Sequence, residues 1–252
     1  MEEALYDRVF QLERTHWWFR ARRDIVFALL RRFLRPRSAD GVTLRICDIG
    51  CACGLILAEL MKAGYDAVGI DSSDTALEYC ADRGVQALKG ILPERIPLEE
   101  ESVDAILMLD VLEHIDDDRA SLHSVVRFLR PGGLIICTVP AYPWLWTKRD
   151  ESHHHRRRYN MTRFTAILYA CPDAEVVVST YINMFLFPLA LVERFGRKLL
   201  RLTPQTADIS IPPFGLNYLM WKVFAAERTA IVNGVRFPFG LSILGVLRKK
   251  QI

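Results

Sequence analysis

Residues 47–54 read Cys-Asp-Ile-Gly-Cys-Ala-Cys-Gly, and this stretch decides the fold prediction. The apolar run 44–49 leads into it, and the small residues that follow end at Gly54. Small residues let a backbone turn sharply and approach a ligand closely where the next helix begins. The stretch therefore predicts a buried strand, a tight ligand-binding turn and a helix, in that order.

Apolar strands and helices alternate outward from this turn. We expect helices over 55–62, 75–81 and 119–129, and strands over 67–70, 85–88, 103–109 and 134–139. Near-continuous apolar strands separated by helices are typical of a parallel sheet covered on both faces. The sequence therefore predicts an α/β fold.

The last third of the chain changes character. We expect a helix over 161–170 with Thr162 as its N-cap, a strand over 175–182 and a last strand over 241–247. The roughly 55 residues between these two strands are too many for a plain loop in a compact domain. They are predicted to hold an apolar helix around 185–202, a proline-rich turn at 211–213 and a helix over 216–232.

Composition and charge narrow the class of protein. The 252 residues are 51% hydrophobic and 25% charged, which excludes intrinsic disorder, and a formal net charge of +3 is too small to indicate nucleic-acid binding. The six cysteines lack the spacing of a zinc site, and the start of the chain lacks the pattern of a signal peptide. No apolar run reaches the roughly 18 residues of a membrane span. We therefore expect a cytoplasmic protein.

Three sequence motifs, taken together in their order and spacing, resemble the motifs of one protein family. Asp48, Gly50 and Gly54 match the D-x-G-x-G-x-G loop of the class I S-adenosylmethionine-dependent methyltransferases. Ala52 replaces the middle glycine of that loop. Segment 109–114 (LDVLEH) and the turn before the fifth strand (RPGG) are similar to further motifs of the family. The resemblance covers residues 44–183 and the last strand.

The resemblance implies a Rossmann-like α/β fold. Its seven-stranded sheet would be mostly parallel, with an antiparallel last strand and helices on both faces. Residues 1–252 would form a single methyltransferase domain. Its four parts would be an N-terminal helical cover (1–40), a cofactor-binding core (44–183), a helical insert between strands six and seven (184–238) and the last strand (239–250).

The resemblance also implies S-adenosylmethionine as the cofactor. Asp71 ends the second predicted strand, where a carboxylate can accept hydrogen bonds from ribose hydroxyls, although it is also a candidate N-cap for the next helix. Ala52 fits the loop provided that its φ is negative. Relatives often place an acidic residue near the adenine, whereas this chain has Ile91 and Leu92, which favours apolar packing of the ring. The expected cofactor-binding residues are Asp48, Gly50, Cys51, Ala52, Gly54, Asp71, Ser72, Ile91, Leu92, Asp110 and Val111.

Segment 140–159 follows the fifth predicted strand, where an acceptor would lie in this architecture. Its aromatic residues, three consecutive histidines and three consecutive arginines indicate either an acceptor pocket or a solvated basic loop. The candidate general bases are His154 and His114, of which His114 is equally well explained as a structural histidine. No metal site is expected, because adjacent histidines cannot all face one ion and no second ligand cluster is evident. The candidate substrate-binding residues are Trp18, Tyr142, His155, Arg157, Arg158 and Tyr159.

Two further segments each allow two interpretations. Trp17 and Trp18 either close the pocket or pack the N-terminal helix on the sheet. In the insert, segment 185–201 begins apolar and ends basic, with Arg194, Arg197, Lys198 and Arg201. One interpretation is a helix that packs on its own domain or in a homodimer. The other is a helix that lies on a membrane surface or holds a lipid-linked substrate. The first interpretation is favoured.

These features together predict an enzyme, an S-adenosylmethionine-dependent methyltransferase. Its acceptor would be a small molecule or a lipid-linked or sugar-linked compound, and the basic clusters favour an anionic group on it. Two other classes stay open. One is a non-catalytic binding protein with a methyltransferase fold. The other is an NAD-dependent oxidoreductase, against which the five-residue spacing of the loop 50–54 argues.

Overall fold

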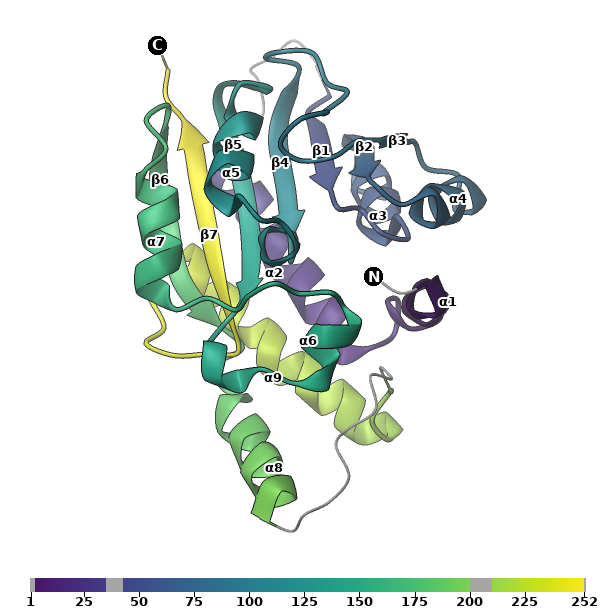
Figure 1. Cartoon of the computed structure of the whole chain (residues 1–252), viewed down its shortest axis with the longest axis vertical. Helices are drawn as coiled ribbons and strands as arrows, with labels where there is room; N and C mark the ends of the chain where they lie inside the picture. The colour runs from purple at the N-terminus through teal and green to yellow at the C-terminus, as the bar shows by residue number, and fades with distance from the viewer. Residues whose placement is uncertain (1–2, 35–42, 200–209, 252) are drawn as a thin grey trace.

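The computed structural model describes residues 3–34, 43–199 and 210–251. Its strands form one seven-stranded sheet in the order β3-β2-β1-β4-β5-β7-β6 (Figure 1). Adjacent strands from β3 to β5 are parallel, and β7 is antiparallel to both β5 and β6. The predicted mixed sheet with an antiparallel last strand is confirmed. The strands are β1 (Arg45–Ile49), β2 (Asp66–Asp71), β3 (Ala87–Lys89), β4 (Val103–Leu109), β5 (Leu129–Pro140), β6 (Ala174–Ile182) and β7 (Ser242–Lys249).

Helices cover both faces of the sheet. In Figure 1, α5 and α7 lie in front of the strands and α2 lies behind them. The α-helices are α1 (Glu3–Leu12), α2 (Trp17–Phe33), α3 (Leu55–Lys62), α4 (Asp74–Asp82), α5 (Asp118–Val126), α6 (Lys148–Ser152), α7 (Met161–Tyr169), α8 (Phe187–Leu199) and α9 (Phe214–Val232). Two 3₁₀ turns, η1 (Leu112–His114) and η2 (Pro143–Leu145), follow β4 and β5.

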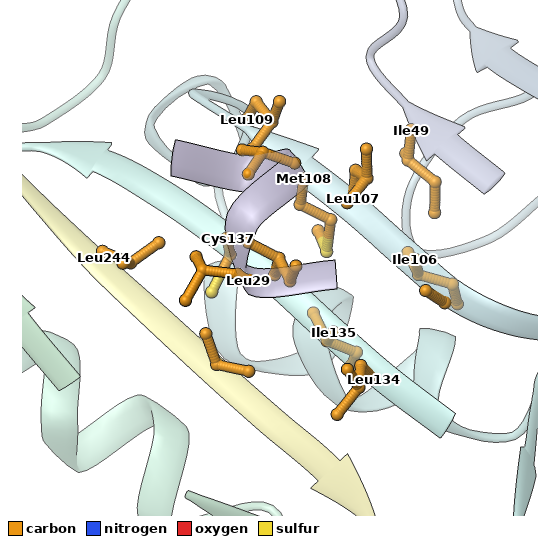
Figure 2. Close-up of a cluster of buried hydrophobic side chains, with 14 of the residues drawn as sticks. Leu29, Ile49, Ile106, Leu107, Met108, Leu109, Leu134, Ile135, Cys137 and Leu244 are labelled. Carbon is orange, nitrogen blue, oxygen red and sulfur yellow. The ribbon is translucent and has the colours of Figure 1, made fainter. Parts of the chain in front are cut away.

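The core forms where α2 packs on the middle of the sheet. All seven residues of β4 are buried; six of them are apolar, and the seventh, Asp104, pairs with Arg130 at 2.7 Å. The buried positions of α2 recur every three to four residues, which places them on one face of the helix. Figure 2 shows Leu29 of α2 beside Met108 of β4 and Cys137 of β5. This core holds the carboxyl ends of β1, β4 and β5 in place.

The helical insert fastens the N-terminal helices to the rest of the fold. Helix α9 packs against α2. The Asn217 side chain of α9 accepts a hydrogen bond from the Trp17 amide and donates one to the Thr15 carbonyl, both at 2.9 Å. The Trp221 indole N–H donates to Asp24 at 2.8 Å. The insert therefore determines where the start of α2 and its tryptophans lie.

Glu227 of α9 holds the junction between β6 and α8. Its side chain is 1% exposed, and its carboxylate accepts hydrogen bonds from three consecutive backbone amides, those of Asn183 (2.7 Å), Met184 (2.7 Å) and Phe185 (3.1 Å). Burial raises the pKa of Glu227, and these three amide donors oppose that rise. One buried acid thus satisfies the backbone where the chain leaves the sheet.

Several predicted boundaries differ from the structure. Asn160, and not Thr162, is the N-cap of α7, because its side chain accepts from the Arg163 amide at 2.8 Å. Helix α5 ends at Val126, and β5 already begins at Leu129, so the RPGG turn lies inside the long strand. The predicted part of the insert helix from 200 to 202, which includes Arg201, lies outside the described residues, as do the side chains of Arg197 and Lys198.

Candidate functional site

A cavity of about 320 Å³ opens at the carboxyl ends of β1, β4 and β5, a volume within the usual range for small-ligand sites. Four parts of the chain line it: the α1–α2 region, the loop after β1, the turn after β4 and the segment from β5 to Arg158. Asn183 after β6, Arg194 of α8, Leu241 just before β7 and Ser242 at its start add further contacts. The lining residues with polar or charged side chains include Glu13, His16, Arg22, Asp48, Asp110, Glu113, His114, Thr147, Arg149, Asp150, His153, His155, Arg158, Asn183, Arg194 and Ser242.

The loop after β1 has a left-handed backbone at three positions. Gly50 and Gly54 have a φ of 74°, and a Cβ on Gly50 would lie 2.6 Å from a methyl group of Val111. Ala52 has a φ of 46°, so the condition of a negative φ, under which alanine fits this loop, is not met. The strained conformation is held from both sides, because the Ala52 amide donates to Asp71 and its carbonyl accepts from the Cys80 thiol.

Asp71 anchors this loop from the end of β2. Its two carboxylate oxygens accept from the amides of Ala52 and Ser73, each at 3.0 Å. Burial raises the pKa of Asp71, and the amide donors oppose the rise. Ser73, whose hydroxyl accepts from the Ala76 amide, is the N-cap of α4, so the alternative of Asp71 as the N-cap is wrong. Each Asp71 oxygen keeps a lone pair for a further donor.

Helix α1 lies against the same end of the site. Its Tyr6 hydroxyl bonds to the Ser73 side chain, and its Tyr6 carbonyl accepts from the Cys53 thiol at 3.5 Å. Four apolar residues of α1 pack with Cys53 and Ala76 in a small second core. The predicted N-terminal cover thus lies beside Asp71.

Arg22 of α2 joins the tryptophans to the turn after β4. Its guanidinium lies 4.2 Å from the ring centre of Trp18 and forms an ion pair with Asp110. Asp110 also accepts from the Thr138 hydroxyl at 3.0 Å. Trp17 and Trp18 both line the cavity, and Trp17 also packs edge-on against Phe224 of α9. This ring contact of Trp17 is therefore with the insert helix α9 and not with the sheet.

The expected cofactor residues fall into two groups. Asp48, Gly50, Cys51, Ala52 and Asp110 line the cavity. Within the described residues, the remaining expected cofactor residues do not line the cavity. Gly54 precedes α3, Val111 packs on Gly50, Asp71 and Ser72 begin the turn into α4, and Ile91 (49% exposed) and Leu92 follow β3.

Asp150 organises the segment after β5, although the sequence analysis did not select it. Its side chain is 1% exposed and accepts from the Thr147 amide (2.7 Å), Arg158 Nε (2.7 Å) and His155 Nδ1 (2.9 Å). Burial alone would raise the pKa of Asp150, but the hydrogen bonds from His155 and Arg158 outweigh it and hold the pKa well below its ordinary value. The pattern Thr147-Lys-Arg-Asp150 is a capping-box signal that was available in the sequence.

The three consecutive histidines separate in the fold. His153 and His155 line the cavity, whereas His154 is exposed, has a φ of 57° and does not line it. This placement corrects the choice of His154 as a candidate base. His114 also lines the cavity, with its ring centre 4.8 Å from that of His155. Burial lowers the pKa of His114 to about 4 and that of His153 to about 3, so both imidazoles are neutral at pH 7.

The candidate substrate residues also divide. Trp18, His155 and Arg158 line the cavity, but Arg157 and Tyr159 do not. Both of these bond to Asp118, Arg157 at 3.0 Å and the fully buried Tyr159 at 2.8 Å, so they hold the segment in place. Tyr142 stacks on Tyr181 outside the cavity. The basic side chains that join Arg158 at the cavity are Arg149 and Arg194.

Unpartnered buried polar atoms gather at this cavity. Among the described residues, Arg22 Nε, His153 Nε2, both oxygens of Glu113 and both amide atoms of Asn183 are buried without a hydrogen-bond partner, and all four residues line it. Such atoms are rare in folded proteins because each costs free energy. Their concentration here indicates a site built for a polar ligand.

The fold and the site together define a class of protein. A loop of small residues after β1, a carboxylate at the end of β2 and an antiparallel last strand are the arrangement of class I S-adenosylmethionine-dependent methyltransferases, and this chain contains such a methyltransferase domain. Residues 47–137 match a family model described as a methyltransferase domain.

Individual relatives agree with this class. A ubiquinone biosynthesis O-methyltransferase of Maricaulis maris is 32% identical over 100 residues, which are 37% of this chain and 39% of the relative. A protein of Haloferax volcanii, solved in complex with the Trm112 methyltransferase activator, has a TM-score of 0.59 at 16% identity over 99% of this chain and 96% of its own. A phosphoethanolamine N-methyltransferase of Haemonchus contortus, solved with S-adenosylmethionine, has a TM-score of 0.52 at 19% identity. The match covers 90% of this chain and 52% of the other. The chain spans less than half the length of the curated relatives that it matches.

Proposed function

We propose that this protein transfers a methyl group from S-adenosylmethionine to a small, polar acceptor. The observation that carries the proposal is the Asp71 carboxylate, which holds the loop after β1 through the Ala52 amide and retains lone pairs for ribose hydroxyls. The methyltransferase domain match over residues 47–137 and the cofactor in the Haemonchus contortus neighbour support the same choice of cofactor.

The residues present fit this cofactor. The orphaned Arg22 Nε is a donor that a ligand carboxylate would satisfy, and Asp48, which is 3% exposed at the cavity wall, is an acceptor for an ammonium group. Burial raises the pKa of Asp48 to about 7, and a bound cation would favour its ionised form. S-adenosylmethionine supplies, when bound, a methyl carbon on a positively charged sulfur. The chain has to hold an acceptor in line with that carbon.

The acceptor side of the cavity is polar and cationic. Arg149, Arg158 and Arg194 line it, and the unpartnered amide of Asn183 faces the same space. Guanidinium groups in such a pocket favour an anionic group on the acceptor. His114 and His153 line the same space, but burial lowers the pKa of both imidazoles, which makes them weak proton acceptors. The size of the cavity fits a small molecule.

Transfer of an isotope-labelled methyl group tests this function. We expect the protein to label a small molecule in a fractionated metabolite extract, and Arg149→Gln to reduce the yield about tenfold or more, because it removes a charge at the cavity. Lys148→Gln, at an exposed neighbouring position outside the cavity, is the matched control. Cofactor binding without any labelled product would instead favour the non-catalytic binding protein.

A second proposal concerns the surface of α8. Leu189 and Val192 are three residues apart in α8, so they share one helix face, and they are 53% and 70% exposed. Phe185, which is 51% exposed, lies in the turn just before this helix. Arg194 donates to the Leu145 carbonyl, which places this helix beside the exposed Trp144 and Trp146. Aliphatic residues next to tryptophans suit the boundary of a lipid bilayer. We propose that this face contacts a membrane surface; none of the described helices is long and apolar enough to cross one.

Vesicle flotation tests the membrane contact. Vesicles with anionic lipid should carry the protein upward, and the double variant Leu189→Asp/Val192→Asp should lose most of that binding because it places two charges on the apolar face. Tyr169→Ser, which removes a 71% exposed aromatic residue on α7, should have no effect. A sedimenting dimer that the double variant dissociates, with no flotation of the wild type, would assign the face to a homodimer instead.

A further inference from the structure

A cluster of possible metal ligands forms where the turn after β4 meets the segment after β5. Glu113 and His114 belong to η1, and His155 follows α6 about 40 residues later. One potential ligand atom from each of the three lies within 4.8 Å of the other two. The segment of three histidines therefore contributes one residue to the cluster, and the turn after β4 supplies the second set of ligands that was not evident in the sequence.

Glu113 is the residue that most requires a partner. Its side chain is fully buried, lines the cavity, and has no hydrogen bond to either carboxylate oxygen among the described residues. A buried carboxylate without a hydrogen bond or a cation is strongly unfavourable, so such groups either stay protonated or bind a cation. Asp110, three residues earlier, is already occupied by Arg22 and Thr138.

Both histidines are held by contacts with neighbouring groups. His155 Nδ1 is 2.9 Å from Asp150, which leaves Nε2 free. The His114 ring lies near the backbone of His154 and packs edge-on against the ring of His155, with the ring centres 4.8 Å apart. A carboxylate or backbone partner on the far nitrogen is the usual arrangement for imidazoles that bind metals, because it fixes the tautomer and the direction of the ring.

Arg22 and Arg158, the two cations that act on Glu113, already have carboxylate partners. Arg22 is paired with Asp110, and Arg158 is paired with Asp150. The present spacing of up to 4.8 Å between ligand atoms is wider than the roughly 3.0–3.5 Å found around a bound transition-metal ion. Side-chain rotations that draw the ligand atoms together by about 1–2 Å would complete the site.

We propose that Glu113, His114 and His155 bind a divalent transition-metal ion at the wall of the cavity. Two imidazoles and one carboxylate suit Zn²⁺, Fe²⁺ or Mn²⁺ and leave coordination positions open toward the cavity. An ion there would coordinate an oxygen of the acceptor and lower its pKa before methyl transfer. That role rests on the proposed function, whereas the binding of the ion does not.

Metal titration of the purified full chain tests the site. The protein is stripped with a chelator and titrated with Zn²⁺ by calorimetry, and with Co²⁺ by visible absorption, which reports the coordination of the bound ion. We expect one equivalent to bind. Glu113→Gln and His155→Gln should each weaken Zn²⁺ binding at least tenfold, and Asp150→Asn should weaken it less because Asp150 only orients His155. His154→Asn, which alters the exposed neighbour, should bind as the wild type does.

Two further measurements separate the explanations. Thermal melting of each variant shows whether it is folded, and Glu113→Gln keeps the shape of the side chain, so loss of metal binding by a folded protein identifies a ligand. Binding of S-adenosylmethionine, measured on the metal-free protein, tests the proposed function independently. No metal bound to the wild type, or equal binding to the double variant Glu113→Gln/His155→Gln, would overturn the inference even if the cofactor binds.

Discussion

Asp71→Ala should weaken the binding of S-adenosylmethionine about 100-fold or more. The substitution removes the acceptor proposed for the ribose hydroxyls and also releases the amides of Ala52 and Ser73, which Asp71 holds at 3.0 Å. Charge-assisted hydrogen bonds contribute about 1.5–3 kcal/mol each, so the loss of two corresponds to a factor of this size. Isothermal titration calorimetry with S-adenosylmethionine and with its demethylated product measures the change.

Two variants make this result specific. Asp71→Asn keeps an oxygen for one amide but removes the charge, so its affinity should lie between those of the wild type and Asp71→Ala. Asp74→Ala removes an exposed carboxylate that pairs with Lys89 on the far side of the same turn and should bind normally. Unchanged cofactor affinity in a folded Asp71→Ala protein would refute the ribose assignment.

Glu227→Ala should lower the free energy of unfolding by about 3 kcal/mol, because it leaves three amides at the junction of β6 and α8 without an acceptor. For a chain of this length that change corresponds to a melting temperature lower by about 6–12 °C. Differential scanning calorimetry measures both quantities. The loss should extend to the site, because Asn183 lines the cavity from this junction.

The matched control is Arg228→Ala, which removes an exposed side chain from the next position of α9 and should change stability by about 0.5 kcal/mol or less. Glu227→Gln should be intermediate, because its amide oxygen can still accept from part of the junction. If Glu227→Ala and Arg228→Ala melt at the same temperature, the three hydrogen bonds do not stabilise the fold as proposed.

The sheet could be predicted from the sequence because its signals are local. The run that forms β4 is apolar apart from Asp104, and small residues mark the turn after β1. The boundaries that differ depend on competition between neighbouring signals. Asn160 outcompetes Thr162 as the cap of α7 because its oxygen reaches an amide three residues ahead.

The acceptor side of the site could be predicted only in part, because side-chain direction within a run depends on the tertiary fold. His153, His154 and His155 are indistinguishable in sequence, yet a positive φ at His154 leaves it exposed while its two neighbours line the cavity. Glu113 lies in a segment that was quoted for its resemblance to the family, but nothing local shows that it is buried without a partner. Contacts between residues far apart in the chain decide both.

The position of α1 beside Asp71 has a consequence for how often the cofactor could be exchanged. A nucleoside bound beside Asp71 would lie next to this ten-residue helix, whose contacts with the fold include the small cluster around Cys53 and Ala76, the bond from Tyr79 to Asp7 and the packing of Arg83 on Phe10. A short helix at the edge of a fold opens more often than the central sheet does. The interval between successive cofactors would then depend on how often α1 opens, and this helix would influence the rate of turnover without contacting the acceptor.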